Sequence, residues 1–169
     1  MAVERKVILP EEQTQLENIL REFLKNSEAK GVLLVDLSGA LVSQQGFIQR
    51  FDTTSLSVLS AGTISSTKQM ARLIGENLFT DLFLQGKRDH IYLSLIGNDA
   101  VLVAIFDNST TLGLVRLYAR QTVRALRQVL TRVIHRGIAK PKFQKSSPTK
   151  KEIPSQIFPE DKSEESEES

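Results

Sequence analysis

Residues 100–134 read AVLVAIFDNSTTLGLVRLYARQTVRALRQVLTRVI, and this stretch joins the two kinds of element that decide the fold. Residues 101–106 have the β-branched and aromatic bias of a buried strand. Residues 107–111 carry short oxygen-bearing side chains, which cap helix N-termini because their oxygens accept hydrogen bonds from otherwise unpaired backbone N–H groups. A long helical pattern follows over residues 112–135. The stretch therefore predicts a strand, a polar turn and a helix, with no obvious catalytic residue among them.

The composition predicts one domain with appendages. The chain has 169 residues, of which 40% are hydrophobic, so it can bury a core. It has no cysteine, which excludes disulfides, thiolate nucleophiles and cysteine-bound zinc. The net charge of +2 favours neither a nucleic-acid nor a membrane partner. No apolar run has the length of a signal peptide or of a membrane span, so we expect a cytoplasmic protein without membrane insertion.

Hydrophobic periodicity and turn residues predict three helices and five strands. Pro10 suits the first turn of the first helix, and Leu16, Leu20 and Phe23 repeat on one of its faces. Gly39 suits a tight turn between the first two strands because it tolerates positive φ. Asp52 and the threonines after it suit the cap of a middle helix. The predicted strands cover residues 31–36, 40–45, 82–85, 90–96 and 101–106, and the middle and last helices cover 53–74 and 112–135.

These elements predict a two-sided α/β sandwich. Strands joined by turns this short are antiparallel neighbours. The later strands are apolar on both faces, with Ile91, Leu93 and Leu95 on one and Tyr92 and Ile96 on the other, so both faces need cover. We expect the first and last helices on one face of a five-stranded antiparallel sheet and the middle helix on the other. The order is α-β-β-α-β-β-β-α, in a domain over residues 7–137.

Several kinds of chemistry are missing from the sequence. It has no phosphate-binding loop of the type G-x-x-x-x-G-K-[ST] and no G-x-G-x-x-G, so we expect no bound nucleotide or other cofactor. His90 and His135 lie in different elements, which disfavours a metal site. Asp36 and Asp107 both end strands, and we interpret them as a turn residue and a helix cap rather than as an acid–base pair. We therefore expect no enzyme activity and no catalytic residue of the protein's own.

The middle helix has an unusual exposed face. Placed at 100° per residue, Leu56, Leu59, Thr63, Met70 and Ile74 gather on one side, which we expect to pack on the sheet. The opposite side is small at its centre and poor in helix formers, although a weak surface helix would look similar. We interpret it as a contact surface, formed by Val58, Ala61, Ser65, Lys68, Gln69 and Arg72.

The strand after the middle helix predicts a second contact. Its apolar residues and a candidate free edge invite pairing with another chain, and a two-fold dimer commonly closes such an edge. We therefore expect a homodimer joined through this strand and the middle helices. The expected interface residues are Ile64, Phe79, Leu82 and Leu84.

Two features stay open between alternatives. Arg116, Arg120, Arg124 and Arg127 form one stripe on the last helix, which is either a solvated face or a contact for an acidic partner or a phosphate. Residues 140–169 are basic and then acidic, and their composition predicts a disordered tail. Within this tail Ile153, Ile157 and Phe158 form either a short docking peptide or part of an inert linker.

Three segments resemble the roadblock family of dynein light chain relatives, and within it the bacterial MglB-like branch. They are VLLVDLSGALVSQQG (32–46), DTTSLSVLSAGTISSTKQMARLIGENLF (52–79) and VLVAIFDNSTTLGLVRL (101–117). The resemblance implies a roadblock (profilin-like) sandwich. It also implies a homodimer that activates GTP hydrolysis by a small Ras-like GTPase of the MglA type, in cell polarity or motility.

The same resemblance bears on the site and on the mechanism. It implies that the GTPase contacts the exposed face of the middle helix, and that the GTPase's own residues are repositioned without an inserted arginine. In such proteins the C-terminal extension is a further candidate contact. The alternatives are a roadblock scaffold that tethers a GTPase or motor complex without changing turnover, and a ligand-sensing domain of similar topology.

Overall fold

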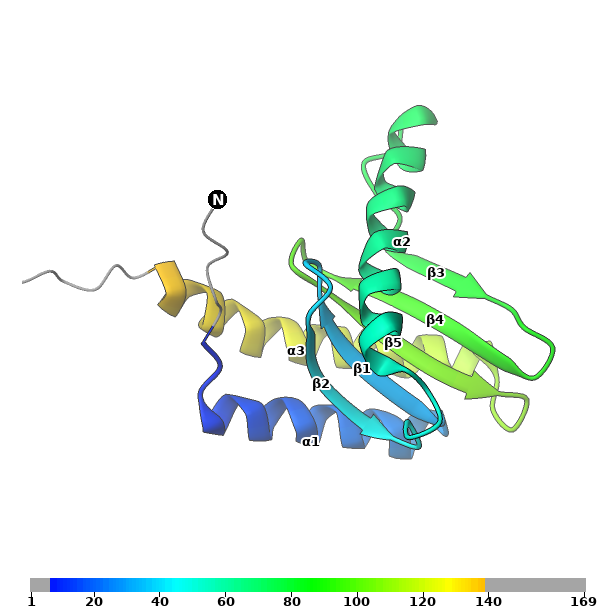
Figure 1. Cartoon of the computed structure of the whole chain (residues 1–169), viewed down its shortest axis with the longest axis horizontal. Helices are drawn as coiled ribbons and strands as arrows, with labels where there is room; N and C mark the ends of the chain where they lie inside the picture. The colour runs from blue at the N-terminus through cyan, green and yellow to red at the C-terminus, as the bar shows by residue number, and fades with distance from the viewer. Residues whose placement is uncertain (1–6, 139–169) are drawn as a thin grey trace, which may run out of the picture. The chain divides into compact units, whose positions relative to one another are not determined.

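The computed structural model describes residues 7–138 and shows three helices and one five-stranded sheet (Figure 1). The helices are α1 (Pro10–Ser27), α2 (Thr53–Leu73) and α3 (Leu112–Ile138). The strands are β1 (Gly31–Asp36), β2 (Leu41–Gly46), β3 (Asp81–Leu84), β4 (Asp89–Ile96) and β5 (Ala100–Asp107). The predicted order of elements is confirmed, and most boundaries agree within one residue. Among the described residues no helix is long and apolar enough to span a membrane.

The sheet is antiparallel throughout, in the order β2-β1-β5-β4-β3. β5 lies at its centre, where Val103 pairs with Leu33 of β1 and Leu93 of β4. Because β5 is covered on both faces, Val101 to Phe106 are all buried, as the apolar run predicts. β2 and β3 form the two edges, so the free edge expected at β3 is present.

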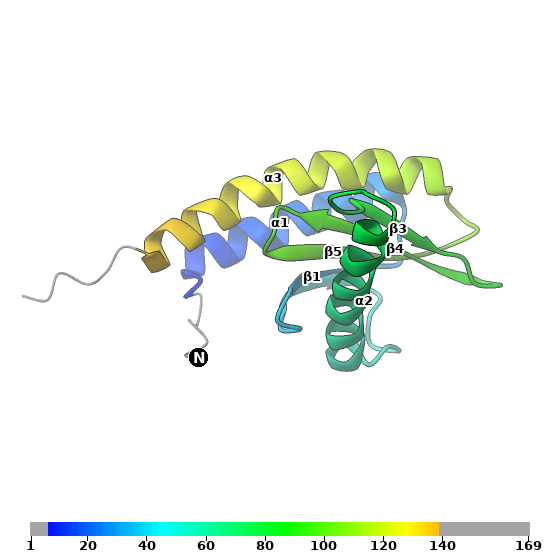
Figure 2. The ribbon, with the colours of Figure 1, turned by 90° about the horizontal axis from the view of Figure 1, so that it is seen from above.

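The helices cover the two faces of the sheet as expected (Figure 2). α1 and α3 lie side by side on one face, where Leu16, Phe23 and Leu126 pack against Tyr92 and Phe106. α2 lies on the other face, above the cluster that includes Leu33, Val35, Leu93 and Val103. The predicted division of β4 is confirmed, since Tyr92 and Ile96 belong to the first core and Leu93 and Leu95 to the second.

The start of α1 is tied to the end of α3 by a contact that the sequence did not predict. Glu12 is buried, and its two carboxylate oxygens accept hydrogen bonds of 2.7 and 2.6 Å from the guanidinium of Arg136. The backbone N–H of Leu9 also donates to Glu12, at 2.9 Å. Arg136 and then Leu9 lower the pKa of Glu12 from 4.5 to about 2. This ion pair joins the N-terminal end of α1 to the C-terminal end of α3, which lie in the same layer.

The turn before α3 differs in detail from the expectation. Asp107 does not cap the helix, because its carboxylate accepts from the N–H of Ser109 at 2.9 Å within the turn. The hydroxyl of Thr111 accepts from the N–H of Leu114 instead, at 3.2 Å. The hydroxyl of Thr110 is buried and donates to the carbonyl of Ser27 at 2.7 Å, which fixes the start of α3 to the end of α1.

Candidate partner-binding surface on helix α2

α2 is stabilised at both ends and along its length by local hydrogen bonds. Asp52 caps its N-terminus by accepting from the N–H of Ser55 at 3.0 Å and from the Ser55 hydroxyl at 2.6 Å. These bonds lower the pKa of Asp52. At the other end Gly75 has a φ of +81°, which suits a residue without a side chain. Within the helix, hydroxyls such as those of Ser57 and Ser66 donate to the carbonyl four residues earlier. The serine-rich sequence is therefore compatible with a regular helix.

The face of α2 that packs on the sheet consists mainly of small side chains. Its buried residues are Ser57, Ser60, Ala61, Ile64, Thr67 and Ala71. Ile64 is the one large apolar side chain among them, and it is 3% exposed. Small side chains let the helix backbone lie close to β1, β2 and β5, which are the strands that α2 contacts most.

Three predictions about this helix are wrong. Ala61 was expected on the exposed face, but it is 7% exposed and packs toward the sheet. Ile64 was expected at a dimer interface, but it belongs to the core beneath α2. Conversely, Leu59, Met70 and Ile74 were expected to pack on the sheet and are 67%, 58% and 68% exposed. The rule that large apolar residues face the core fails here because the sheet accommodates a row of small residues instead.

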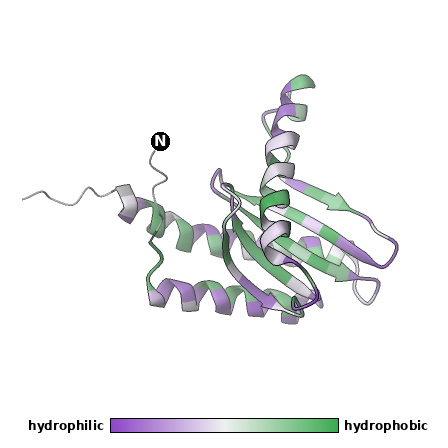
Figure 3. Ribbon diagram, in the orientation of Figure 1, coloured by the Kyte–Doolittle hydropathy of each residue, from purple (hydrophilic) through white to green (hydrophobic). Residues whose placement is uncertain are grey.

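The outer face of α2 is apolar for a surface helix. Val58 is 56% exposed and Leu73 86%, in addition to Leu59 and Met70. Small or polar exposed residues lie between them, namely Gly62, Ser65, Ser66 and Gln69. A side chain at Gly62 would meet no atom within 4 Å, so another molecule has open access to the helix backbone there. Figure 3 shows the helix pale along much of its length and green at its upper end. Such a face is typical of a contact surface.

β3 extends this surface at the edge of the sheet. Leu82 pairs with Leu93, and Leu84 pairs with Ile91, on the sheet face that α2 covers only in part. Leu84 is 43% exposed, whereas Phe79 and Leu82 are half-buried. Of the four expected interface residues, the structure therefore leaves Phe79, Leu82 and Leu84 accessible and excludes Ile64.

The expected α2 contact residues divide in a similar way. Val58, Ser65, Gln69 and Arg72 are exposed and lie within one sector of the helix, while Lys68 is half-buried at its side. The tail residues Ile153, Ile157 and Phe158, and the tail as a whole, lie outside the described residues.

The polar residues considered for catalysis have structural contacts. His90 is buried and packs against the rings of both Phe83 and Phe106, which also contact each other, and its Nδ1 accepts from the N–H of Gly86 at 3.2 Å. Its Nε2 lies 2.9 Å from Oδ1 of Asn108. Asp36 accepts from the N–H of Ser38 at 2.8 Å, in the turn where it was expected. Among residues 7–138 no group of three His, Cys, Asp or Glu side chains is arranged to hold a metal ion.

A cluster of three charged residues joins the start of β1, the start of β4 and the end of β5. Nζ of Lys30 lies 2.7 Å from Asp89 and 2.9 Å from Asp107. The hydrogen bonds from Ser109 and from Lys30 hold the pKa of the Asp107 carboxyl well below its usual range, and the two carboxylates raise the pKa of Lys30. Every group in the cluster is paired, so its role is to fix the strand ends.

The sandwich order, the helix on one face and the pair of helices on the other define the chain as a roadblock domain. A model of the Roadblock/LC7 domain matches residues 15–106, and the chain belongs to this family. Among solved structures, Myxococcus xanthus MglB is 40% identical, with a TM-score of 0.71 over 75% of this chain and 96% of that chain.

Other solved structures give the same picture. The gliding protein MglB from Thermus thermophilus is 27% identical, with a TM-score of 0.71 over 75% of this chain and 96% of that one. A Roadblock/LC7 domain from Streptomyces avermitilis is 12% identical, with a TM-score of 0.63 over 68% of this chain and 97% of that one, and supports the fold alone. Comparison with curated protein sequences finds no match.

Proposed function

We propose that this protein is a GTPase-activating regulator of a small Ras-like GTPase of the MglA type, which acts as a homodimer in cell polarity or motility. The observation that carries the proposal is the outer face of α2. It combines exposed apolar side chains with small residues and lacks cover from within residues 7–138. The 40% identity to MglB over nearly the whole of that chain supports the class of partner.

The proposed surface has two parts, separated around the axis of α2. Val58, Ser65, Gln69 and Arg72 lie in one sector and contact the GTPase. Leu59 and Met70 lie roughly 100° further round the helix and pack on a second copy of the chain. Leu82 and Leu84 on the free edge of β3 continue the dimer contact, because an unpaired edge strand can pair with its own copy across a two-fold axis. The solved MglB with tetrameric arrangement supports self-association in this branch of the family.

The proposed mechanism places no catalytic residue on this chain. Phosphoryl transfer requires placed positive charge and an oriented water molecule, which the GTPase itself provides when its switch segments are correctly arranged. A partner that binds this arrangement more tightly than the others increases its population, and hydrolysis accelerates.

A single-turnover GTP hydrolysis assay with an MglA-type GTPase tests the proposal. We expect acceleration that saturates with the concentration of dimer. Ser65→Arg adds bulk and charge to the small exposed face and should abolish both binding and acceleration. Gln128→Arg makes a comparable change at an exposed position on α3, on the opposite side of the sheet, and should have no effect.

The same assay separates the activator from its main alternative. A roadblock scaffold that tethers a GTPase or motor complex would bind with the same sensitivity to Ser65→Arg but would leave the hydrolysis rate unchanged at saturation. Equal binding by the wild-type protein and Ser65→Arg would instead mean that the GTPase contacts another surface.

A further inference from the structure

α3 is a strongly basic helix on the face of the sheet opposite to α2. It carries arginine at positions 116, 120, 124, 127, 132 and 136 and no aspartate or glutamate. The last two have partners on α1, since Arg132 donates to Gln15 at 2.8 Å and Arg136 pairs with Glu12. Within residues 7–138 the structure gives no ion pair to Arg120, Arg124 or Arg127. These three guanidinium groups therefore have no direct ion pair within residues 7–138, although the carboxylate of Asp81 lines the same cleft.

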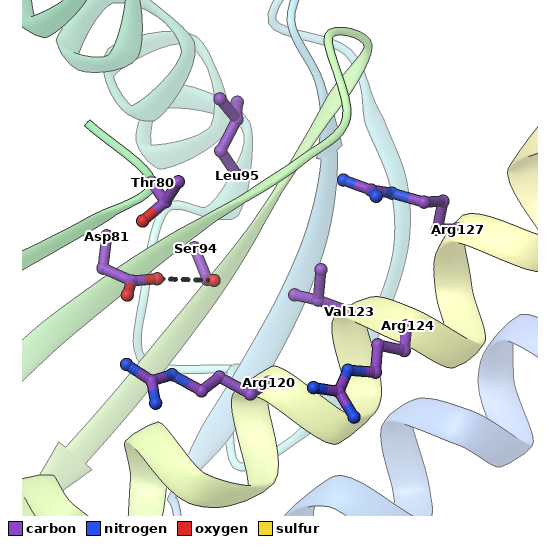
Figure 4. A pocket seen from close by; sticks show the side chains of 8 residues that line it. All are labelled: Thr80, Asp81, Ser94, Leu95, Arg120, Val123, Arg124 and Arg127. Carbon is purple, nitrogen blue, oxygen red and sulfur yellow. Dashed lines mark hydrogen bonds between the residues drawn. The ribbon is translucent and has the colours of Figure 1, made fainter. Parts of the chain in front are cut away.

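The three arginines line one side of a cleft between α3 and the strands β3 and β4 (Figure 4). The cleft has a volume of about 270 Å³. Its other side carries Thr80, Asp81 and Ser94, and the Ser94 hydroxyl donates to Asp81 at 2.9 Å. All three arginine side chains extend from α3 toward these strands (Figure 4). The cleft thus combines a basic wall with a small polar wall.

We propose that this arginine cleft binds an extended, carboxylate-rich segment of a partner protein. Guanidinium groups bind carboxylates through two parallel hydrogen bonds, and arginine suits this geometry better than lysine does. An acidic segment would supply the negative charge that Arg120, Arg124 and Arg127 lack within residues 7–138.

The spacing of the arginines fits an extended segment. Residues four apart on a helix are separated by about 6 Å along the axis, which is the spacing of Arg120 and Arg124, and Arg127 follows about 4.5 Å further on. Side chains on one face of an extended strand recur about every 6.6 Å, which is nearly the interval between Arg120 and Arg124. Two acidic residues at alternate positions of a bound segment would therefore meet Arg120 and Arg124, and Arg127 lies within reach of a third.

The opposite wall favours a peptide over a compact anion such as phosphate. Asp81 retains acceptor capacity beyond its bond with Ser94, and a peptide backbone has N–H donors to satisfy it. A compact phosphate anion offers no N–H donor and would lie wholly beside this carboxylate, whereas an extended peptide can place backbone N–H groups at Asp81 and its own carboxylates at the arginines. The cleft lies on the opposite face of the sheet from α2, so its occupant does not compete with a partner on α2. The proposal does not rest on GTPase activation, although Asp81 belongs to β3, the strand whose edge the proposed dimer uses.

The experiment measures binding of a fluorescein-labelled peptide, GESESESG, to the full chain by fluorescence anisotropy at low ionic strength. R120Q/R124Q removes two cleft arginines, and we expect it to weaken binding about tenfold. R21Q/K25Q removes the same charge from exposed positions on α1 and should change affinity by less than about twofold. R120K/R124K keeps the positive charge but lacks the planar guanidinium group, so its affinity for the peptide should lie between those of the wild type and R120Q/R124Q.

Four results would overturn the proposal. They are no binding of the peptide, equal losses in R120Q/R124Q and R21Q/K25Q, undiminished binding of the control peptide GQSQSQSG, and complete displacement of the peptide by equimolar inorganic phosphate. The last result would identify a small-anion site instead. GTP hydrolysis measured with R120Q/R124Q should match the wild type, so failure of this proposal is distinguishable from failure of the proposed GTPase activation.

Discussion

Ile64 and Leu59 lie on the same helix, and each loses three carbon atoms when it is replaced by alanine. Ile64 is 3% exposed and packs on the sheet, whereas Leu59 is 67% exposed on the outer face of α2. Removing three buried carbons costs about 2.4 kcal/mol in transfer free energy, and the cavity adds to this, so we expect Ile64→Ala to lower the free energy of unfolding by about 3–4 kcal/mol.

Leu59→Ala should behave differently. About a third of the Leu59 side chain is covered within the chain, so its loss should lower the stability of a single copy by at most about 0.8 kcal/mol. If Leu59 packs on a second copy, the loss has an additional part that depends on protein concentration. The effect of Ile64→Ala contains no such part, because that residue is covered by its own chain.

Urea unfolding followed by circular dichroism, over a hundredfold range of protein concentration, measures both effects. Sedimentation of the same samples reports the oligomeric state. A stability loss for Leu59→Ala as large as that for Ile64→Ala at every concentration would refute this orientation of α2. So would an Ile64→Ala variant that stays as stable as the wild type and becomes monomeric.

Three further predictions concern the parts of the fold that hold these surfaces in place. Glu12→Gln should lower stability at pH 7 by about 1–2 kcal/mol, after allowance for the exposure of Arg136, while Glu11→Gln should change little. Because folding lowers the pKa of Glu12, the carboxylate stabilises the fold above pH 4.5. The difference in the free energy of unfolding between wild type and Glu12→Gln should therefore shrink as the pH falls from about 5 toward 2. A difference that does not change with pH would exclude the ion pair as its cause. Gly46→Ala should lower the melting temperature more than Gly75→Ala does. Both glycines have a positive φ, but only at Gly46 would a Cβ lie 2.5 Å from the Lys30 carbonyl oxygen. Equal losses in the two variants would show that this steric clash does not occur. Thr110→Val should lower the free energy of unfolding by about 1–3 kcal/mol, since it leaves the buried carbonyl of Ser27 unpaired, and a neutral result would show that water replaces the hydroxyl.

The arrangement of layers was predictable because it depends on patterns that are local in the chain. The short turns on either side of β4 require its neighbours to be antiparallel, and the apolar run of β5 requires helices on both faces of the sheet. The position of Gly39, with a φ of +94°, agrees with the tight turn that joins β1 to β2.

The site was only partly predictable. Val58, Ser65, Gln69 and Arg72 are exposed as the helical pattern suggests, whereas Ala61 and Ile64 are buried. Placing α2 by its largest apolar residues turns it the wrong way. The alternative row of Ser57, Ser60, Ile64, Thr67 and Ala71 is visible in the sequence at helical spacing, but it ranks lower because serine is polar. Only the close approach of the helix to the sheet, with the hydroxyls of Ser57 and Thr67 bonded to carbonyls of their own helix, makes that row the better core.

By itself, then, the sequence determined the order of the elements, the cap of α2, the turns between the strands, and the need for helices on both faces of the sheet. These depend on backbone conformation and on the period of apolar residues, which neighbouring residues set. The tertiary structure decided which side of α2 faces outward, that Glu12 meets Arg136, and that three arginines of α3 open onto one cleft with Asp81. Each of these depends on distances between segments far apart in the chain, and such distances follow from how closely side chains pack when the layers come together.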